Sequence, residues 1–138
     1  MKGPPCGRAG APRVRPLNRR EMELNTKWVV EMKGNQKVLH PPPSNTKQEK
    51  GNPPKVFEFD YCFWSMDESN TTKYTGQEVV FKCLGEGILG KAFQGYNACI
   101  FAYGQTGSGK SVSMMGNPEQ GGLLPRLCFI SKDLSGAE

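Results

Sequence analysis

Three short segments in the first half of the chain carry apolar residues in a pattern that is typical of β-strands. Two of them, residues 28–30 and 37–39, flank a Gly34-Asn35 pair, which favours a tight turn and predicts a hairpin. The third, Lys55–Asp60, predicts a further strand, and a polar, proline-containing loop precedes it over residues 41–54. Residues 13–16 are compatible with the end of another short strand.

Helical spacing replaces this pattern after residue 76. An apolar residue recurs every four positions from Val80 to Ala92, which predicts a helix from Gln77 to about Gln94. The Thr-x-x-Glu spacing of residues 75–78 predicts a capping box at its start, and Gly95 predicts its end. Three glycines inside this helix weaken it by about 1 kcal/mol each relative to alanine.

A continuous apolar run follows at residues Asn97–Tyr103. Such a run predicts a strand covered on both faces, as in a parallel sheet, and it is far too short to span a bilayer. A glycine-rich loop comes next, and the residues Lys110–Met115 then favour the start of a helix. The loop is therefore predicted to join a buried strand to a helix.

The loop has the spacing Gly-x-x-x-x-Gly-Lys-Ser, the signature of a phosphate-binding P-loop. It consists of Gly104, Gln105, Thr106, Gly107, Ser108, Gly109, Lys110 and Ser111. Its glycines let backbone N–H groups approach phosphate oxygens, and the following helix directs its positive end toward them. Lys110 is predicted to reach the β- and γ-phosphates, and the Ser111 hydroxyl to bind Mg²⁺. A chance match of this pattern is expected in on the order of 1% of chains of this length.

Composition limits the remaining interpretations. The chain has 138 residues, 36% of them hydrophobic, which suits one small domain with a modest core. The net charge of +5 comes largely from the first 20 residues; we favour a solvated terminus there over a site for nucleic acid, membrane or an acidic protein. The five cysteines are odd in number and lack metal-site spacing, which indicates a reducing, intracellular compartment. No signal peptide is visible.

Other chemical candidates have simpler structural interpretations. His40 has no Cys or His at metal-ligand spacing, so we favour an exposed loop residue. Asp67 and Glu68 are adjacent, which favours a solvated turn over acid–base catalysis. Phe63 and Trp64 favour core packing over a partner surface. No residue is assigned a catalytic role.

The segment 101–111 resembles the P-loop of the kinesin motor domain. Residues 95–98 and 114–116 on either side resemble the same family, and Arg13-Val14-Arg15-Pro16 resembles its Arg-x-Arg-Pro segment. Residues 63–67 and 122–126 resemble the kinesin-3 subfamily in particular, and the likeness extends over about residues 13–127. It implies an α/β, P-loop NTPase-type kinesin motor fold that is incomplete, with the N-terminal part of the central sheet and its flanking helices.

The same resemblance implies an ATP-hydrolysing motor that binds microtubules in the cytoplasm. ATP and Mg²⁺ are the implied cofactors, Ser111 the implied Mg²⁺ ligand, and Arg13, Arg15 and Pro16 the implied adenine contacts. Neither nucleic acid nor a membrane span is expected. We expect an irregular N-terminus at 1–12, a partial motor domain at 13–128 and a divergent tail at 129–138.

Four departures from the family pattern leave the activity of the chain open. Residues 6–12 make a poor strand, and Val112 stands where the family usually has an aromatic residue or histidine. The Ser-Ser-Arg switch and the main microtubule-binding elements are not found in these 138 residues. Residues 133–138 resemble the second switch, Asp-Leu-Ala-Gly-Ser-Glu, but we favour coincidence or a rearranged remnant. The alternative is therefore a truncated, non-motile product that is inactive or acts only as a binding module.

Overall fold

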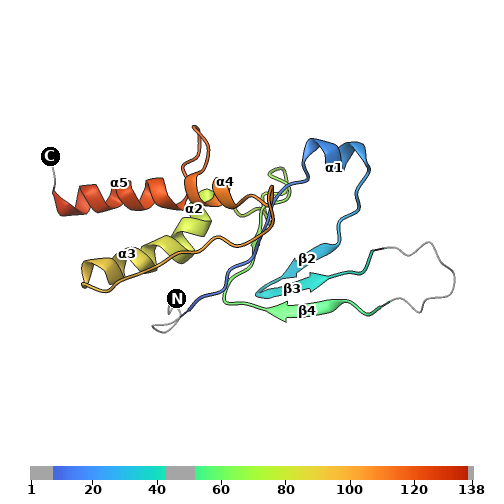
Figure 1. The fold of residues 1–138 in the computed structure, drawn as a ribbon, viewed down its shortest axis with the longest axis horizontal. Helices are drawn as coiled ribbons and strands as arrows, with labels where there is room; N and C mark the ends of the chain where they lie inside the picture. The colour runs from blue at the N-terminus through green and yellow to red at the C-terminus, as the bar shows by residue number, and fades with distance from the viewer. Residues whose placement is uncertain (1–7, 43–51, 137–138) are drawn as a thin grey trace. The chain divides into compact units, whose positions relative to one another are not determined.

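A computed structural model describes residues 8–42 and 52–136 of the chain (Figure 1). The chain divides into two compact units, Met1–Tyr74 and Thr75–Glu138, and each is described by itself. Strands dominate the described part of the first unit, and helices dominate that of the second. The mixture of helix and sheet agrees with the predicted α/β class.

The first unit contains a short parallel pair of strands. Strand β1 (Arg13–Val14) pairs with β5 (Phe63–Trp64), with Arg13 opposite Phe63. Phe63 is buried, as its assignment to the core predicted, and its ring stacks on that of Tyr61 at a centroid distance of 6.0 Å. Backbone hydrogen bonds between the two segments continue before β1 and β5, because the Gly10 carbonyl accepts from the N–H groups of Asp60 and Tyr61. Residues 8–12 form no regular strand, which agrees with their composition.

A three-stranded antiparallel sheet contains the other strands in the described part of this unit. It is formed by β2 (Val30–Lys33), β3 (Gln36–Leu39) and β4 (Lys55–Glu58), in that order, and Figure 1 shows the three side by side. The predicted hairpin is confirmed, with Gly34 at φ 57° in the turn. Its first strand begins at Val30, so Trp28 and Val29 precede the sheet and are exposed. Most of the loop predicted at 41–54 lies outside the described residues.

A short helix that the apolar pattern did not predict follows β1. Helix α1 (Arg19–Glu23) is preceded by its N-cap Asn18, whose side chain accepts a hydrogen bond from the Glu21 backbone. The Glu21 side chain in turn accepts from the Asn18 backbone, which completes a capping box. Asn-x-x-Glu is a recognisable sequence signal for this arrangement, but the helix is too short to show apolar periodicity.

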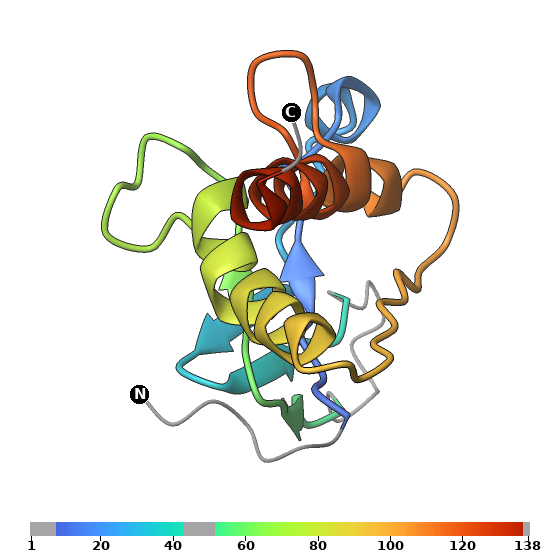
Figure 2. The ribbon, with the colours of Figure 1, turned by 90° about the vertical axis from the view of Figure 1, so that its left-hand side faces the viewer.

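The helix predicted at 77–94 is confirmed, with an irregular middle. It consists of α2 (Gln77–Val80), a π-helical segment η1 (Phe81–Gly85) and α3 (Glu86–Phe93), which follow one another without a break (Figure 2). Gly95, at φ 84°, ends it as expected. The predicted capping box is wrong. A capping box needs Thr75 as the N-cap and Glu78 as the third helical residue. The N-cap is instead Gly76, which makes Glu78 the second helical residue, and no side chain caps the helix.

Helices α4 (Lys110–Met115) and α5 (Leu123–Ser135) are the other helices in the described part of the second unit. An isolated bridge between Gly116 and Gly121 closes the connection between them, and Leu123 at the start of α5 is buried. The predicted helix start at Lys110 is confirmed. Helix α5 runs without interruption through residue 129, at which the sequence suggested that a divergent tail begins.

The strand predicted at Asn97–Tyr103 is wrong for this structure. These residues form no regular secondary structure, and Phe101 and Tyr103 are 86% and 102% exposed. A parallel strand needs neighbouring strands to pair with its backbone groups. Apart from the bridge at Gly116, the described residues of the second unit, 75–136, contain no β-structure that could pair with it.

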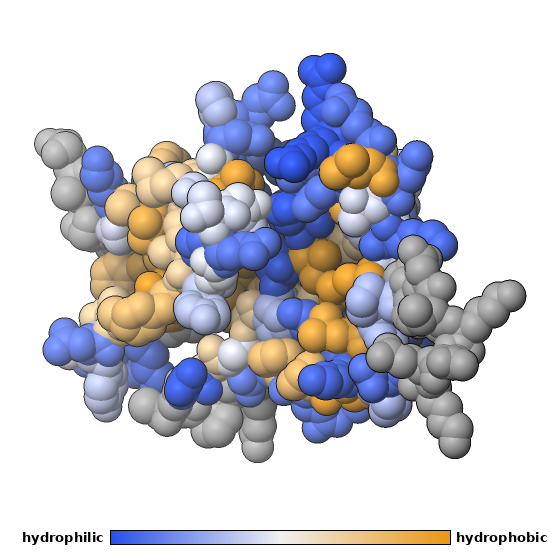
Figure 3. All heavy atoms as spheres, turned by 45° about the vertical axis from the view of Figure 1, so that its right-hand side comes forward, coloured by the Kyte–Doolittle hydropathy of each residue, from blue (hydrophilic) through white to orange (hydrophobic). Residues whose placement is uncertain are grey.

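The core is small in the described part of the chain. Its buried apolar residues are Val38, Phe63, Met66, Val80, Phe81 and Leu123. Many apolar side chains reach the surface instead, and Figure 3 shows broad apolar areas among the polar ones on the face drawn. No helix among the described residues combines the length and apolar character needed to cross a membrane.

Candidate functional site

The glycine-rich loop adopts a backbone that only glycine takes up readily. Gly104, Gly107 and Gly109 have φ values of 156°, 77° and 91°, in the region that side chains with a Cβ disfavour. A Cβ on Gly104 would also press against the Ser108 hydroxyl, so a side chain at this position is excluded twice. Gly109 is the N-cap of α4 and directs the chain into that helix.

Lys110 folds back onto the loop that precedes it. Its ammonium group donates hydrogen bonds to the carbonyl oxygens of Gly104 and Gln105, at 2.6 and 2.7 Å. These two hydrogen bonds close the loop into a ring and keep the positively charged Lys110 ammonium group next to its backbone. The segment 104–111 contains no acidic residue, so its local charge is positive and favours an anion.

Two serines add hydroxyl groups to the loop. The Ser108 hydroxyl oxygen is buried and finds no hydrogen-bond partner among the described residues. A buried hydroxyl without a partner is costly, which suits a site that a polar ligand completes. Ser111 is exposed in the first turn of α4. Its hydroxyl is the kind of hard oxygen ligand that Mg²⁺ accepts together with phosphate oxygens.

Helix α4, which carries Lys110 and Ser111, is fixed by a residue that the sequence analysis missed. The Gln77 side-chain nitrogen donates to the carbonyl oxygen of Val112 at 2.6 Å, and Gln77 is only 6% exposed. Gln77 lies 35 positions before Val112, and no local pattern links such distant residues. A glutamine at the first position of a helix reads as an ordinary solvent-facing residue, so the sequence held no signal for this contact.

Arg13 is half-buried in the first unit. Its Nε donates to the Ser65 hydroxyl at 2.9 Å, and Ser65 is itself buried. Burial lowers the pKa of the Arg13 guanidinium, and the nearby Tyr74 opposes that shift. The side chain therefore fastens β1 to the residue that follows β5.

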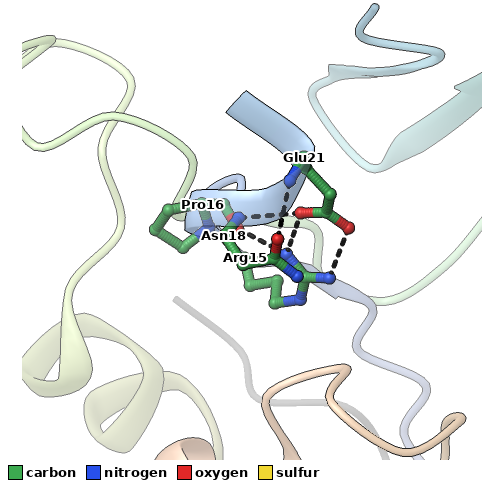
Figure 4. Close-up of polar contacts among 4 residues, drawn as sticks. All are labelled: Arg15, Pro16, Asn18 and Glu21. Atoms are coloured by element: carbon green, nitrogen blue, oxygen red, sulfur yellow. Dashed lines mark hydrogen bonds and ion pairs between the residues drawn. The ribbon is translucent and has the colours of Figure 1, made fainter. Parts of the chain in front are cut away.

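Arg15 forms a bidentate ion pair with Glu21 (Figure 4). The two N–O distances are 2.7 and 2.8 Å, and the same guanidinium also donates to the Pro16 carbonyl at 2.7 Å. The hydrogen bond from Arg15, helped by that from the Asn18 backbone, lowers the pKa of Glu21 to about 2. Arg15 thus holds the capping residue of α1 in its charged form.

The expected site residues fall into separate parts of the structure. The loop and α4 lie in the second unit, whereas Arg13, Arg15 and Pro16 lie in the first. The role of these three residues as adenine contacts stays a prediction.

The minor candidates have structural partners in the described part of the chain. His40 is exposed after β3, with its Nε2 3.2 Å from a Glu31 carboxylate oxygen. Asp67 accepts from the backbone and hydroxyl of Ser69, which makes a local turn and lowers its pKa. Asp133, the first residue of the switch-like tail, lies in the last turns of α5. No group of three or more His, Cys, Asp or Glu side chains within residues 8–42 and 52–136 is placed to hold a metal ion.

Comparisons with known proteins identify relatives of the chain. The sequence model of the kinesin motor domain matches residues 13–130. Kinesin-like protein KIF13A of mouse is 85% identical over 118 residues, which cover 86% of this chain and 7% of that protein. Human kinesin-like protein KIF13B is 62% identical over 121 residues, 6% of its length.

Solved structures give the same result for the fold. A structure of KIF14 with ADP, in complex with a microtubule, superposes with a TM-score of 0.77 at 38% identity. The match covers 93% of this chain and 34% of that one. The chain therefore spans about a third of the solved structure and a small fraction of the full-length relatives.

Proposed function

The chain belongs to the kinesin motor-domain family, and we propose that its segment Gly104–Ser111 binds the phosphates of Mg-ATP as part of a microtubule motor. The observation that carries this proposal is the geometry of the loop. Three glycines with positive φ bend the backbone around the Lys110 ammonium group, directly before a helix. Such an arrangement suits the binding of phosphate groups.

Lys110 has a defined part in this proposal. Its ammonium group donates to two carbonyl oxygens of the loop, which are neutral acceptors. Phosphate oxygens carry a negative charge and form stronger hydrogen bonds with an ammonium group. Entry of the nucleotide therefore exchanges neutral acceptors for charged ones, and the exchange favours the bound state.

The cofactor and the partners follow from the family. The Ser111 hydroxyl would hold Mg²⁺, which neutralises charge on the β- and γ-phosphates when it is bound. Microtubules are the proposed partner, since the KIF14 structure is described as a complex with one. The cytoplasmic microtubule cytoskeleton is the proposed location of the chain.

Calorimetric titration of the 138-residue chain with Mg-ATP tests the phosphate site. We expect saturable binding by the wild type, and a loss of at least about 30-fold for Lys110→Ala, because removal of a charged partner from an ion pair costs about 2–5 kcal/mol. Lys73→Ala is the matched control, since it removes the same charge from an exposed turn of the first unit.

Equal affinities of the wild type and Lys110→Ala would contradict the proposal. A folded chain that binds no nucleotide would support the alternative, a binding module without nucleotide chemistry.

A further inference from the structure

Gln77 is a buried polar residue that contacts the helix carrying the phosphate-binding groups. It is the first residue of α2, and its side chain reaches across the second unit to the Val112 carbonyl at 2.6 Å. Val112 follows Ser111 directly, and Lys110 precedes that serine. The hydrogen bond therefore acts within two residues of both groups assigned to the phosphates and Mg²⁺.

Helix α4 is too short to hold its own position. It has six residues, and isolated helices of this length are marginal in water. Its own bonds include those from Ser113 to Gly109 and from Gly116 to Val112, at 3.0 and 2.8 Å. The Val112 carbonyl is thus shared by a bond within the helix and the bond from Gln77.

The burial of Gln77 adds to the argument. A side-chain amide at 6% exposure is stable only when its polar atoms have partners, so its geometry is closely determined. Because the Gln77 side chain has a determined position, its hydrogen bond also restricts the position of the Val112 carbonyl. In the exposed loop 104–107, the carbonyl oxygens of Gly104 and Gln105 accept hydrogen bonds from Lys110, so the position of α4 bears directly on that of the loop.

We propose that Gln77 is a positioning residue for the phosphate loop, which holds α4 so that Lys110 and Ser111 face a bound nucleotide. This inference rests on the proposed nucleotide site. The role assigned to Gln77 is exerted through its hydrogen bond to the Val112 carbonyl, not through direct contact with the nucleotide.

Gln77→Met is the variant that tests this role. Methionine keeps a similar length and volume but cannot donate to the Val112 carbonyl. We expect the Kd for Mg-ATP to rise about tenfold, equivalent to ~1.4 kcal/mol. Gln94→Met is the matched control, because Gln94 is exposed at the end of α3. The affinity of this variant for Mg-ATP should equal that of the wild type.

Calorimetry separates positioning from stability. A role in folding alone would lower the number of binding sites per chain and the melting temperature, and would leave the Kd of the folded fraction unchanged. Positioning changes the Kd at an unchanged number of sites. A Kd for Gln77→Met equal to that of the wild type would overturn the inference.

NMR gives a second readout that does not depend on nucleotide. Without the Gln77 bond, we expect a shift of the Val112 carbonyl ¹³C resonance and faster amide exchange at Ser113 and Gly116. If the wild type binds no Mg-ATP, the proposed function fails, and this readout alone decides whether Gln77 positions α4. Unchanged exchange and an unchanged carbonyl resonance in Gln77→Met would then overturn the inference.

Discussion

Glu21 connects the Arg-x-Arg-Pro segment to the helix that follows it. Its carboxylate accepts two hydrogen bonds from Arg15 and one from the Asn18 backbone. One side chain therefore satisfies both the arginine and the start of α1, although Glu21 lies near the surface. The arrangement keeps the Arg15 guanidinium beside Pro16, to which it also donates.

The pH dependence of this contact is a prediction at the scale of one residue. The pKa of Glu21 falls from 4.5 to about 2, chiefly through the hydrogen bond from Arg15. Because the folded pKa is lower than the unfolded one, its contribution to stability is present above about pH 4.5 and is lost as the pH falls toward 2. A ¹³C NMR titration of the Glu21 carboxyl carbon should show a midpoint near 2.

Arg15→Gln serves as the control for that titration. Without the guanidinium, the midpoint should return toward the ordinary value for glutamate. A wild-type midpoint between 4 and 4.5, roughly the ordinary value, would show that the ion pair does not form in solution.

The π-helical segment shows how two glycines in one helix can have opposite roles. Gly85 is buried, and a Cβ there would collide with the Phe81 ring. Gly87 stands two residues later with open space around its Cβ position. The first glycine is required by packing, whereas the second only weakens the helix.

Alanine substitutions at these two glycines make a matched pair. We expect Gly85→Ala to lower the free energy of unfolding by about 1–3 kcal/mol through overpacking against Phe81. Gly87→Ala should raise it by about 1 kcal/mol, because alanine favours the helix. Urea denaturation measures both, and an increase in stability for both variants would contradict the packing described here.

Local signals predicted the elements that depend on nearby residues. The Gly34-Asn35 turn, the end of the long helix at Gly95 and the start of α4 at Lys110 each follow from residues within a few positions. Pairing over long distances was not predictable in this way. The run 97–103 has the composition of a buried strand, but its conformation depends on neighbours that the described part of the second unit does not provide.

The same difference between local and distant contacts applies to the candidate site. The sequence predicted the loop glycines, Lys110 and Ser111, because the phosphate loop is one continuous segment. Gln77 was not, because its function depends on a contact with a helix 35 positions away.

At the scale of the whole molecule, the family assignment and the fold agree. The kinesin motor domain matches residues 13–130, and the solved KIF14 structure superposes over 93% of the chain. The same match covers 34% of the KIF14 chain. Activity as a motor is therefore proposed for the family member as a whole, and nucleotide binding is the claim that this chain can test.

Titration of the ¹⁵N-labelled chain with Mg-ADP tests this claim most directly. We predict saturable shifts of amide resonances within 104–111, largest at Gly107, Gly109 and Lys110, and their loss in Lys110→Ala. Shifts confined to the basic residues 8–20 would assign anion binding to the N-terminus instead. That result, or no shift at saturating Mg-ADP, would contradict the account.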